Sequence, residues 1–123
     1  LGDVYKRQAE NMSIYTGDDK TSARDILMGF KGNISVTANI APLEMHNMCK
    51  LAAEGKEAEA KKINSKIDIL HDNLFIESNP IPVKWALNRM GLIKKGIRLP
   101  LTWMDEIYED KLEKSLKDAG VEF

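Results

Sequence analysis

Two adjacent carboxylates, Asp18 and Asp19, follow a short apolar run, which is where α/β folds place many of their catalytic groups. A carboxylate pair can share a proton and act as acid and base only when both side chains point into one site. Consecutive side chains of an extended chain point in opposite directions. We therefore expect Asp18 and Asp19 to form a turn and to cap the helix that follows.

The other side chains capable of chemistry are scattered along the chain. Lys84 follows a rigid turn at residues 81–83, and a helix surface is favoured over the desolvated pocket that a Schiff-base lysine needs. His46 and His71 fall on different predicted helices, without Cys or carboxylate ligands at suitable spacing. Cys49 follows a helical apolar pattern, which predicts core packing. The residues alone predict no catalytic residue, no metal site and no cofactor.

The composition narrows the class of protein. The chain has 123 residues, of which 43% are hydrophobic and 30% charged, and its net charge is -1. This balance predicts a soluble domain with a core and gives no electrostatic reason to expect nucleic acid or an anionic membrane as a partner. Neither a membrane span nor a secretory signal is evident, so we expect a cytoplasmic protein. The length excludes a complete (β/α)8 barrel, which needs about 250 residues.

The first third of the chain predicts two strands joined by a helix. Residues 12–16 and 33–37 alternate in polarity and are rich in β-branched side chains. The helix between them begins near Asp19 or Thr21, either of which can cap it, and its apolar side contains Ile26, Leu27 and Phe30. A strand, a helix and a second strand in this order favour parallel pairing.

Four helices are predicted in the remaining chain. Pro42 can begin the first, which ends at Gly55; the second spans about residues 56–76; Pro82 can begin the third, which ends at Met90; and Thr102 can cap the last. Their helical spacing predicts a set of buried positions. These are Leu43, Met45, Met48, Cys49 and Ala52 in the first, Ile63, Ile67, Leu70 and Leu74 in the second, and Met104, Ile107, Tyr108, Leu112, Leu116 and Ala119 in the last.

Residues 1–8 invite a separate interpretation. Their codons can be written CTC GGA GAT GTG TAT AAG AGA CAG, which resembles the end of a transposase adapter used to prepare sequencing libraries. We interpret residues 1–8 as a translated adapter and exclude them from fold reasoning. On this interpretation the reading frame begins inside a gene.

Several ordered motifs resemble the dihydrodipicolinate synthase family, also called 4-hydroxy-tetrahydrodipicolinate synthase. The similarity is to the carboxy-terminal part of that family and covers about residues 9–123. It is carried by Tyr-Thr-Gly-Asp-Asp at 15–19, Gly-Asn-Ile-Ser-Val-Thr-Ala-Asn at 32–39, Met-Cys-Lys-Leu-Ala-Ala-Glu-Gly at 48–55, Asn-Pro-Ile-Pro-Val-Lys-Trp at 79–85 and Arg-Leu-Pro-Leu-Thr at 98–102. Phe30 and Lys31 depart from the pattern, since a glycine is common there.

The resemblance implies a helix-rich α/β fold. Residues 9–55 would supply the last two strand-helix units of a TIM (β/α)8 barrel, and residues 56–123 the C-terminal helical domain. The family is a cytoplasmic, homotetrameric lyase of lysine and diaminopimelate biosynthesis. It condenses pyruvate with L-aspartate 4-semialdehyde through a Schiff-base lysine, giving 4-hydroxy-tetrahydrodipicolinate. That lysine and its catalytic partners would lie upstream, so we expect this chain to be inactive alone.

The resemblance also implies two substrate-binding positions. Ile34 matches a position on the last barrel strand whose main-chain carbonyl faces pyruvate while its side chain packs. Gly17 matches a glycine after the seventh strand, where a missing side chain lets the ligand approach. Asn79 is a weaker candidate at the entrance.

Two other interpretations remain open. The chain could belong to another pyruvate aldolase, such as N-acetylneuraminate lyase, although the runs at 32–39 and 79–85 favour the synthase. It could also be a non-catalytic helical interaction module.

Overall fold

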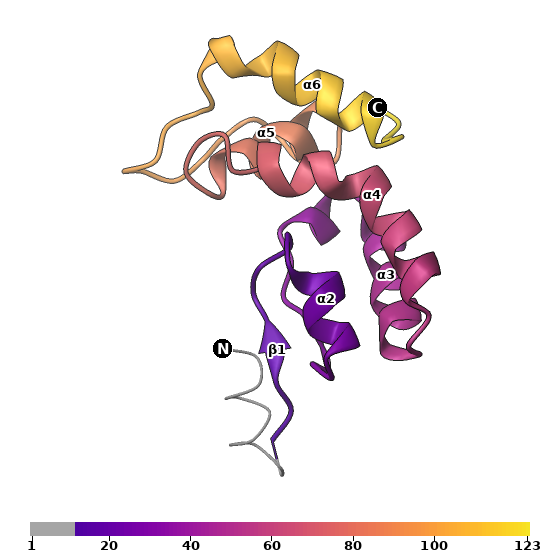
Figure 1. Ribbon diagram of the computed structural model, residues 1–123. Helices are drawn as coiled ribbons and strands as arrows, with labels where there is room; N and C mark the ends of the chain where they lie inside the picture. The colour runs from indigo at the N-terminus through magenta and orange to yellow at the C-terminus, as the bar shows by residue number, and fades with distance from the viewer. Residues whose placement is uncertain (1–11) are drawn as a thin grey trace.

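The computed structural model describes residues 12–123, so the adapter interpretation of residues 1–8 concerns a part of the chain outside the described residues. A small β-layer precedes a set of helices (Figure 1). The elements are β1 (Tyr15–Thr16), α2 (Ser22–Leu27), β2 (Gly32–Asn33), the 3-10 helix η1 (Thr37–Asn39), α3 (Pro42–Ala53), α4 (Glu57–Asn73), α5 (Ile81–Arg89), the 3-10 helix η2 (Glu106–Tyr108) and α6 (Glu109–Asp118).

The two strands pair in parallel, as the order strand, helix, strand predicts. Tyr15 is opposite Gly32, and Thr16 is opposite Asn33. Flanking hydrogen bonds extend the pairing at both ends, because Lys31 N donates to Ile14 O at 2.7 Å and Ile34 N donates to Thr16 O at 2.9 Å. Even so, β1 covers only Tyr15–Thr16 and is shorter than the predicted residues 12–16.

The prediction of a second strand over residues 33–37 is wrong beyond Asn33, where β2 ends. The backbone N–H groups of Val36 and Thr37 donate to the carboxylate of Asp19, at 2.9 and 3.0 Å. Groups bonded to a side chain cannot also take part in a strand ladder. The chain therefore turns after Ile34 and enters η1.

The predicted helices after Asn39 are present, with some shifted ends. Pro42 is the first residue of α3, as expected, whereas α5 begins at Ile81, one residue before Pro82. The last helix does not begin at Thr102. Asp105 is its cap, because its carboxylate accepts a hydrogen bond from Ile107 N at 3.0 Å, and η2 leads into α6.

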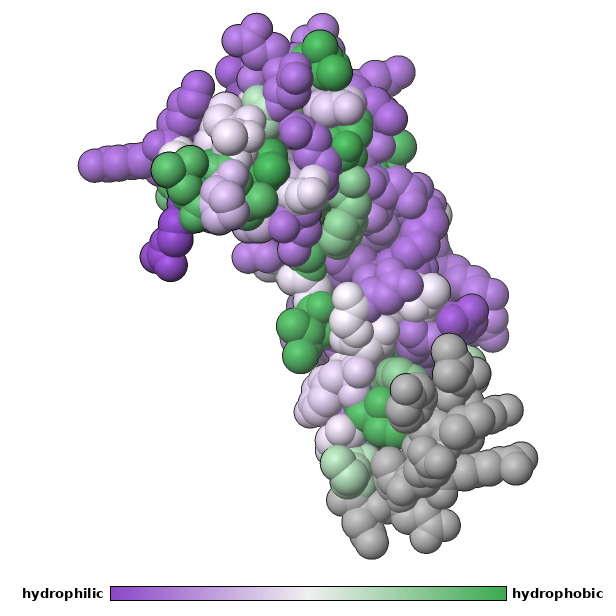
Figure 2. All heavy atoms as spheres, turned by 90° about the vertical axis from the view of Figure 1, so that its left-hand side faces the viewer, coloured by the Kyte–Doolittle hydropathy of each residue, from purple (hydrophilic) through white to green (hydrophobic). Residues whose placement is uncertain are grey.

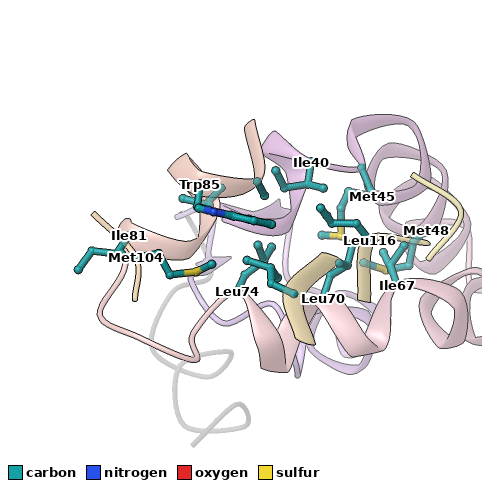
Figure 3. Packing of buried hydrophobic residues seen from close by; sticks show 14 of the residues in the cluster. Ile40, Met45, Met48, Ile67, Leu70, Leu74, Ile81, Trp85, Met104 and Leu116 are labelled. Carbon is teal, nitrogen blue, oxygen red and sulfur yellow. The ribbon is translucent and has the colours of Figure 1, made fainter. Parts of the chain in front are cut away.

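One apolar core joins the segments before and after residue 55 (Figure 3). Met48, Leu70 and Leu116 have no exposed surface, and they come from α3, α4 and α6. A buried hydrogen bond of 2.8 Å from Asn73 Nδ2 to Ser115 Oγ adds a polar contact between α4 and α6. Cys49 is half-buried and packs against the core, as predicted.

Two predicted core positions are wrong. Leu43 is 64% exposed and Ile107 is 74% exposed. Leu43 lies in the first turn of α3, and Ile107 lies in η2, whose threefold repeat differs from the α-helical spacing used to predict it. Helical periodicity predicts the apolar side of each helix. It does not predict which residues at the ends of that side are covered by neighbouring helices.

The surface mixes charged and apolar groups. Hydrophilic residues cover much of the helical part in Figure 2, and hydrophobic residues form separate patches on that face. Among the described residues, no helix has both the length and the apolar character required to cross a membrane.

Candidate functional site

The two predicted substrate-binding residues lie at the same end of the parallel strands. Gly17 directly follows β1, and Ile34 directly follows β2, where its N–H is held by Thr16 O at 2.9 Å. Because the pair is parallel, these are both carboxyl ends, which is where α/β folds form their sites. Apart from its two chain neighbours, a Cβ atom built on Gly17 would meet no atom of residues 12–123 within 4 Å. The backbone at this edge is therefore open to a ligand.

Both the side chain and the carbonyl of Ile34 are uncovered within the described residues. Its side chain is 77% exposed, so it does not pack within the described chain. Among residues 12–123, no backbone N–H donates to its carbonyl oxygen. A carbonyl without such a bond is available to accept a hydrogen bond from a ligand, and the main-chain role expected for Ile34 stays a prediction.

Asp19 organises the turn that follows Ile34. Its side chain is buried, with the residue only 4% exposed, and Asn33 Nδ2 donates to its Oδ1 at 2.7 Å. Its Oδ2 accepts the two N–H groups of Val36 and Thr37 described above. The expectation that Asp19 or Thr21 caps the next helix is wrong, since neither side chain makes a capping bond to α2. The carboxylate instead ties the end of β1 to the turn after β2.

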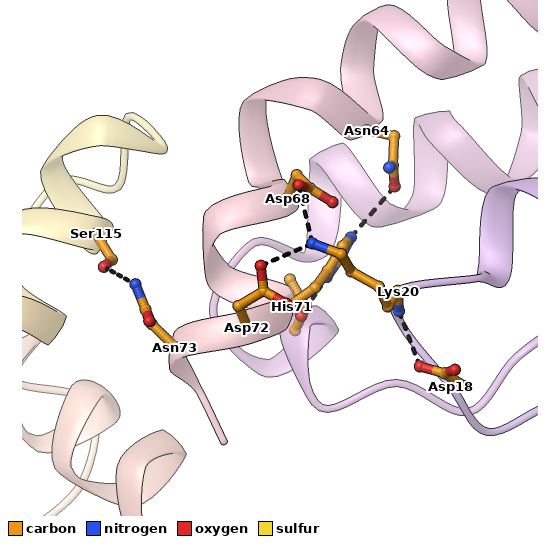
Figure 4. A network of polar contacts seen from close by, with 9 residues as sticks. Asp18, Lys20, Asn64, Asp68, His71, Asp72, Asn73 and Ser115 are labelled. Carbon is orange, nitrogen blue, oxygen red and sulfur yellow. Dashed lines mark hydrogen bonds and ion pairs between the residues drawn. The ribbon is translucent and has the colours of Figure 1, made fainter. Parts of the chain in front are cut away.

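Asp18 forms the predicted turn. Its Oδ1 accepts a hydrogen bond from Lys20 N at 3.0 Å. Lys20 in turn reaches helix α4, where its Nζ pairs with Asp68 at 3.0 Å and with Asp72 at 2.7 Å (Figure 4). Hydrogen bonds to Asp72 and Asp68 raise the pKa of Lys20. The loop after β1 is thus joined to α4 by exposed ion pairs.

A buried histidine joins α4 to the turn after β2. Thr37 Oγ1 and His71 Nδ1 are 2.8 Å apart. His71 Nε2 is 3.2 Å from Asn64 Oδ1 (Figure 4). Asn64 Oδ1 can only accept, so Nε2 carries the proton and Nδ1 accepts from the Thr37 hydroxyl. Burial lowers the pKa of His71, which favours this neutral form at pH near 7.

The remaining candidates lie elsewhere. Lys84 is in the first turn of α5, partly exposed, as the helix-surface expectation requires. Asn79 is exposed in the α4–α5 connection. His46 is exposed on α3 and, together with Cys49, lines a groove of about 340 Å³ beside β1 and β2. Within residues 12–123, no three His, Cys, Asp or Glu side chains gather as a metal site would require.

Sequence reasoning missed the roles of Thr37 and His71. The sequence pattern predicts Thr37 in a strand and offers for His71 only the role of a metal ligand, which it does not favour. Thr37 has no exposed surface and His71 is 4% exposed. The one available signal was a histidine beside Leu70 on the apolar side of a predicted helix, where a polar group must find a partner.

Two parallel strands, each followed by a helix, with polar groups at their carboxyl ends, define a segment of an α/β protein. The chain belongs to the dihydrodipicolinate synthetase family, whose model matches residues 2–119. That match includes most of residues 1–8, and the adapter interpretation of those residues stays a prediction.

Individual relatives agree with the family. The 4-hydroxy-tetrahydrodipicolinate synthase of Thioalkalivibrio sulfidiphilus is 52% identical over 119 residues, which are 97% of this chain and 40% of that protein. The chloride-inhibited dihydrodipicolinate synthase of Acinetobacter baumannii, solved in complex with pyruvate, is 51% identical and superposes with a TM-score of 0.95 over 98% of this chain and 42% of that one. A monomeric dihydrodipicolinate synthase variant, 33% identical, superposes with a TM-score of 0.89 over 98% of this chain and 40% of that one. The chain thus spans about 40% of the length of these relatives.

Proposed function

We propose that this chain is a carboxy-terminal segment of a 4-hydroxy-tetrahydrodipicolinate synthase, a lyase that condenses pyruvate with L-aspartate 4-semialdehyde. The observation that carries the proposal is the close superposition on a pyruvate-bound synthase at 51% sequence identity. Two parallel strand-helix units and a helical region are what the end of a (β/α)8 barrel and its C-terminal domain would supply. Residues 9–55 are the barrel part and residues 56–123 the helical domain.

In this proposal the segment contributes backbone to the pyruvate site. The Ile34 carbonyl accepts a hydrogen bond from bound pyruvate, and Gly17 leaves space for it to approach. The missing barrel strands cover the exposed Ile34 side chain. Support comes from the open space beside Gly17 and the unpaired carbonyl of Ile34 at the same strand end.

The Schiff-base lysine is supplied by the part of the synthase that precedes this segment. Lys84 is not a substitute, because it lies on the helical domain rather than at the strand ends. The 123-residue chain is therefore inactive alone, and the complete enzyme is cytoplasmic. The homotetramer expected for the family is a property of that complete enzyme.

A chimaera tests the assignment. Residues 12–123 replace the matching part of the Thioalkalivibrio sulfidiphilus enzyme, which is 52% identical. Condensation of pyruvate with aspartate semialdehyde should be restored in the chimaera and absent from either part alone. A folded chimaera without condensing activity, beside an active unmodified enzyme, would count against the proposal.

The pyruvate contact has its own test. In the active chimaera, Gly17→Ala should raise the KM for pyruvate by about tenfold, because the added methyl group enters the space that the ligand uses. The KM for aspartate semialdehyde should change little. Since a Cβ at Gly17 meets no atom of the described residues within 4 Å beyond its chain neighbours, this segment should fold normally in the variant. An unchanged KM for pyruvate would remove Gly17 from the site.

A further inference from the structure

The backbone of Ile34 is followed by a turn that is held from two sides. On the strand side, the Asp19 carboxylate accepts the N–H groups of Val36 and Thr37 at 2.9 and 3.0 Å. On the helical side, the Thr37 hydroxyl donates to His71 Nδ1 at 2.8 Å. The bonds that involve Thr37 are buried and the bond from Val36 is partly buried, so water competes poorly with the contacts at Thr37.

These contacts limit how the Ile34 carbonyl can turn. Its position depends on the peptide plane between Ile34 and Ser35. That plane lies between the Ile34 N–H, held by Thr16 O, and the Val36 N–H, held by Asp19. The next residue, Thr37, is held by His71. With its neighbours fixed in this way, the carbonyl has little freedom to rotate.

The position of the His71 ring is fixed by its helix and by a second hydrogen bond. His71 lies in the last turn of the seventeen-residue helix α4, which packs along α3. Its second nitrogen donates to Asn64 Oδ1, two turns earlier on the same helix, and this fixes the ring and its tautomer. A ring held at both nitrogens can fix the position of the group it contacts.

We propose that His71, through Thr37, is a positioning residue of the helical domain that aims the Ile34 carbonyl at bound pyruvate. The inference rests on the proposed function, since it concerns the same pyruvate site. It gives the helical domain a specific part in substrate binding that needs no direct contact between His71 and the ligand.

The test uses the complete protein that carries these residues, obtained by extending its reading frame upstream. Thr37→Val and Thr37→Ser form one matched pair, since only serine keeps the hydroxyl. His71→Gln and His71→Asn form the other, because the amide of asparagine occupies the place of Nδ1, whereas that of glutamine occupies the place of Nε2. His46→Gln, on the exposed face of α3, is the control.

Thr37→Val and His71→Gln should each lower kcat/KM for pyruvate about 10- to 100-fold, with the KM for aspartate semialdehyde within about twofold of the unmodified value. Thr37→Ser, His71→Asn and His46→Gln should stay close to the unmodified protein. The double variant Thr37→Val with His71→Gln should lose no more kcat/KM for pyruvate than either single variant, because both substitutions remove the same hydrogen bond between Thr37 and His71.

The proposal would be overturned by equal losses for both substrates, by no loss in Thr37→Val, or by equal damage in His71→Asn and His71→Gln. A cooperative loss of folding in Thr37→Val would also overturn it, because the contact would then support the whole domain rather than the turn.

Amide hydrogen exchange at Val36 and Thr37 separates this proposal from the proposed function. Exchange should accelerate in His71→Gln and not in His71→Asn. A complete protein without condensing activity would refute the synthase assignment, while the exchange rates would still decide whether His71 holds the turn. Unchanged exchange in His71→Gln would refute the positioning role.

Discussion

At the residue scale, Asp19 is a structural carboxylate rather than an acid or base. It receives three hydrogen bonds, from Asn33 Nδ2 and from the N–H groups of Val36 and Thr37. All of its described partners are donors, so its charge is used to hold the end of β1 against the turn after β2. Asp18, its neighbour, faces solvent and holds only the local turn.

Replacing Asp19 should therefore cost far more stability than replacing Asp18. Asp19→Ala leaves buried N–H groups without an acceptor and should lower the free energy of unfolding by about 1–3 kcal/mol. Asp18→Ala, at an exposed turn, should change it by about 0.5 kcal/mol or less. Urea denaturation of the two variants measures the difference. Equal effects would show that the bonds to Val36 and Thr37 contribute little.

His71 should make stability depend on pH. Burial lowers its pKa in the folded protein below the ordinary value of 6.5; Asp19, Asp68 and Asp72 oppose that shift, while Lys20 assists it. As the pH falls below about 6.5, the unfolded chain takes up a proton before the folded one does. The free energy of unfolding should thus be constant above that pH, fall below it, and level off once the pH is below the folded pKa.

Denaturation between about pH 7 and about pH 5 checks this dependence, with His71→Asn as the comparison. The variant lacks the titrating ring, so its curve should be flatter over this interval. Identical slopes in both proteins would assign the dependence to other groups.

At the scale of elements, α6 is held by a narrow apolar stripe and by polar contacts at its edges. Leu112 and Leu116 have no exposed surface. Trp85 Nε1 on α5 donates to Glu109 Oε1 at 3.0 Å, and Arg89 on α5 pairs with Glu113 at 2.9 Å. Because Arg89 and Glu113 lie near the surface, we expect the apolar stripe to dominate.

Leu116→Ala should lower the free energy of unfolding by about 2–5 kcal/mol, since it leaves a cavity among α3, α4 and α6. Ile107→Ala removes a similar side chain, but that residue is 74% exposed, so about 0.5 kcal/mol or less is expected. Chemical denaturation of both variants compares them. A similar loss at Ile107 would mean that the sequence periodicity, and not the structure, describes the core correctly.

At the scale of the whole molecule, the β-layer and the helices differ in how much support they receive. The described sheet has two strands of two residues each. A pair this small is only marginally stable by itself, and its outer edges are unpaired among the described residues. The helices, in contrast, share one continuous core. The 123 residues alone should therefore be ordered unevenly.

Amide hydrogen exchange of the isolated chain measures this difference. Amides of α4 and α6 should exchange slowly, and those of residues 14–16 and 31–34 quickly. Slow exchange in both strands of a monomer would contradict the expectation, because it would mean that the strands need no further part of a barrel.

The sequence by itself determined much of the local structure. The parallel strands, the helix spacing and the start of α3 at Pro42 follow from polarity patterns and from proline geometry. The family motifs also pointed to the family that the comparisons establish. Gly17 and Ile34 could be proposed as site residues because the motifs that contain them are contiguous in sequence.

Only the tertiary structure decided which polar side chains join the strands, the turn after β2 and helix α4. Asp19 and Val36 are 17 residues apart, and Thr37 and His71 are 34 apart. Neither contact leaves a periodic signal, because each depends on where packing brings two buried polar groups within reach. The same contacts keep the second strand from continuing beyond the bond of Ile34 N, since the N–H groups of Val36 and Thr37 that would extend the ladder are bonded to Asp19.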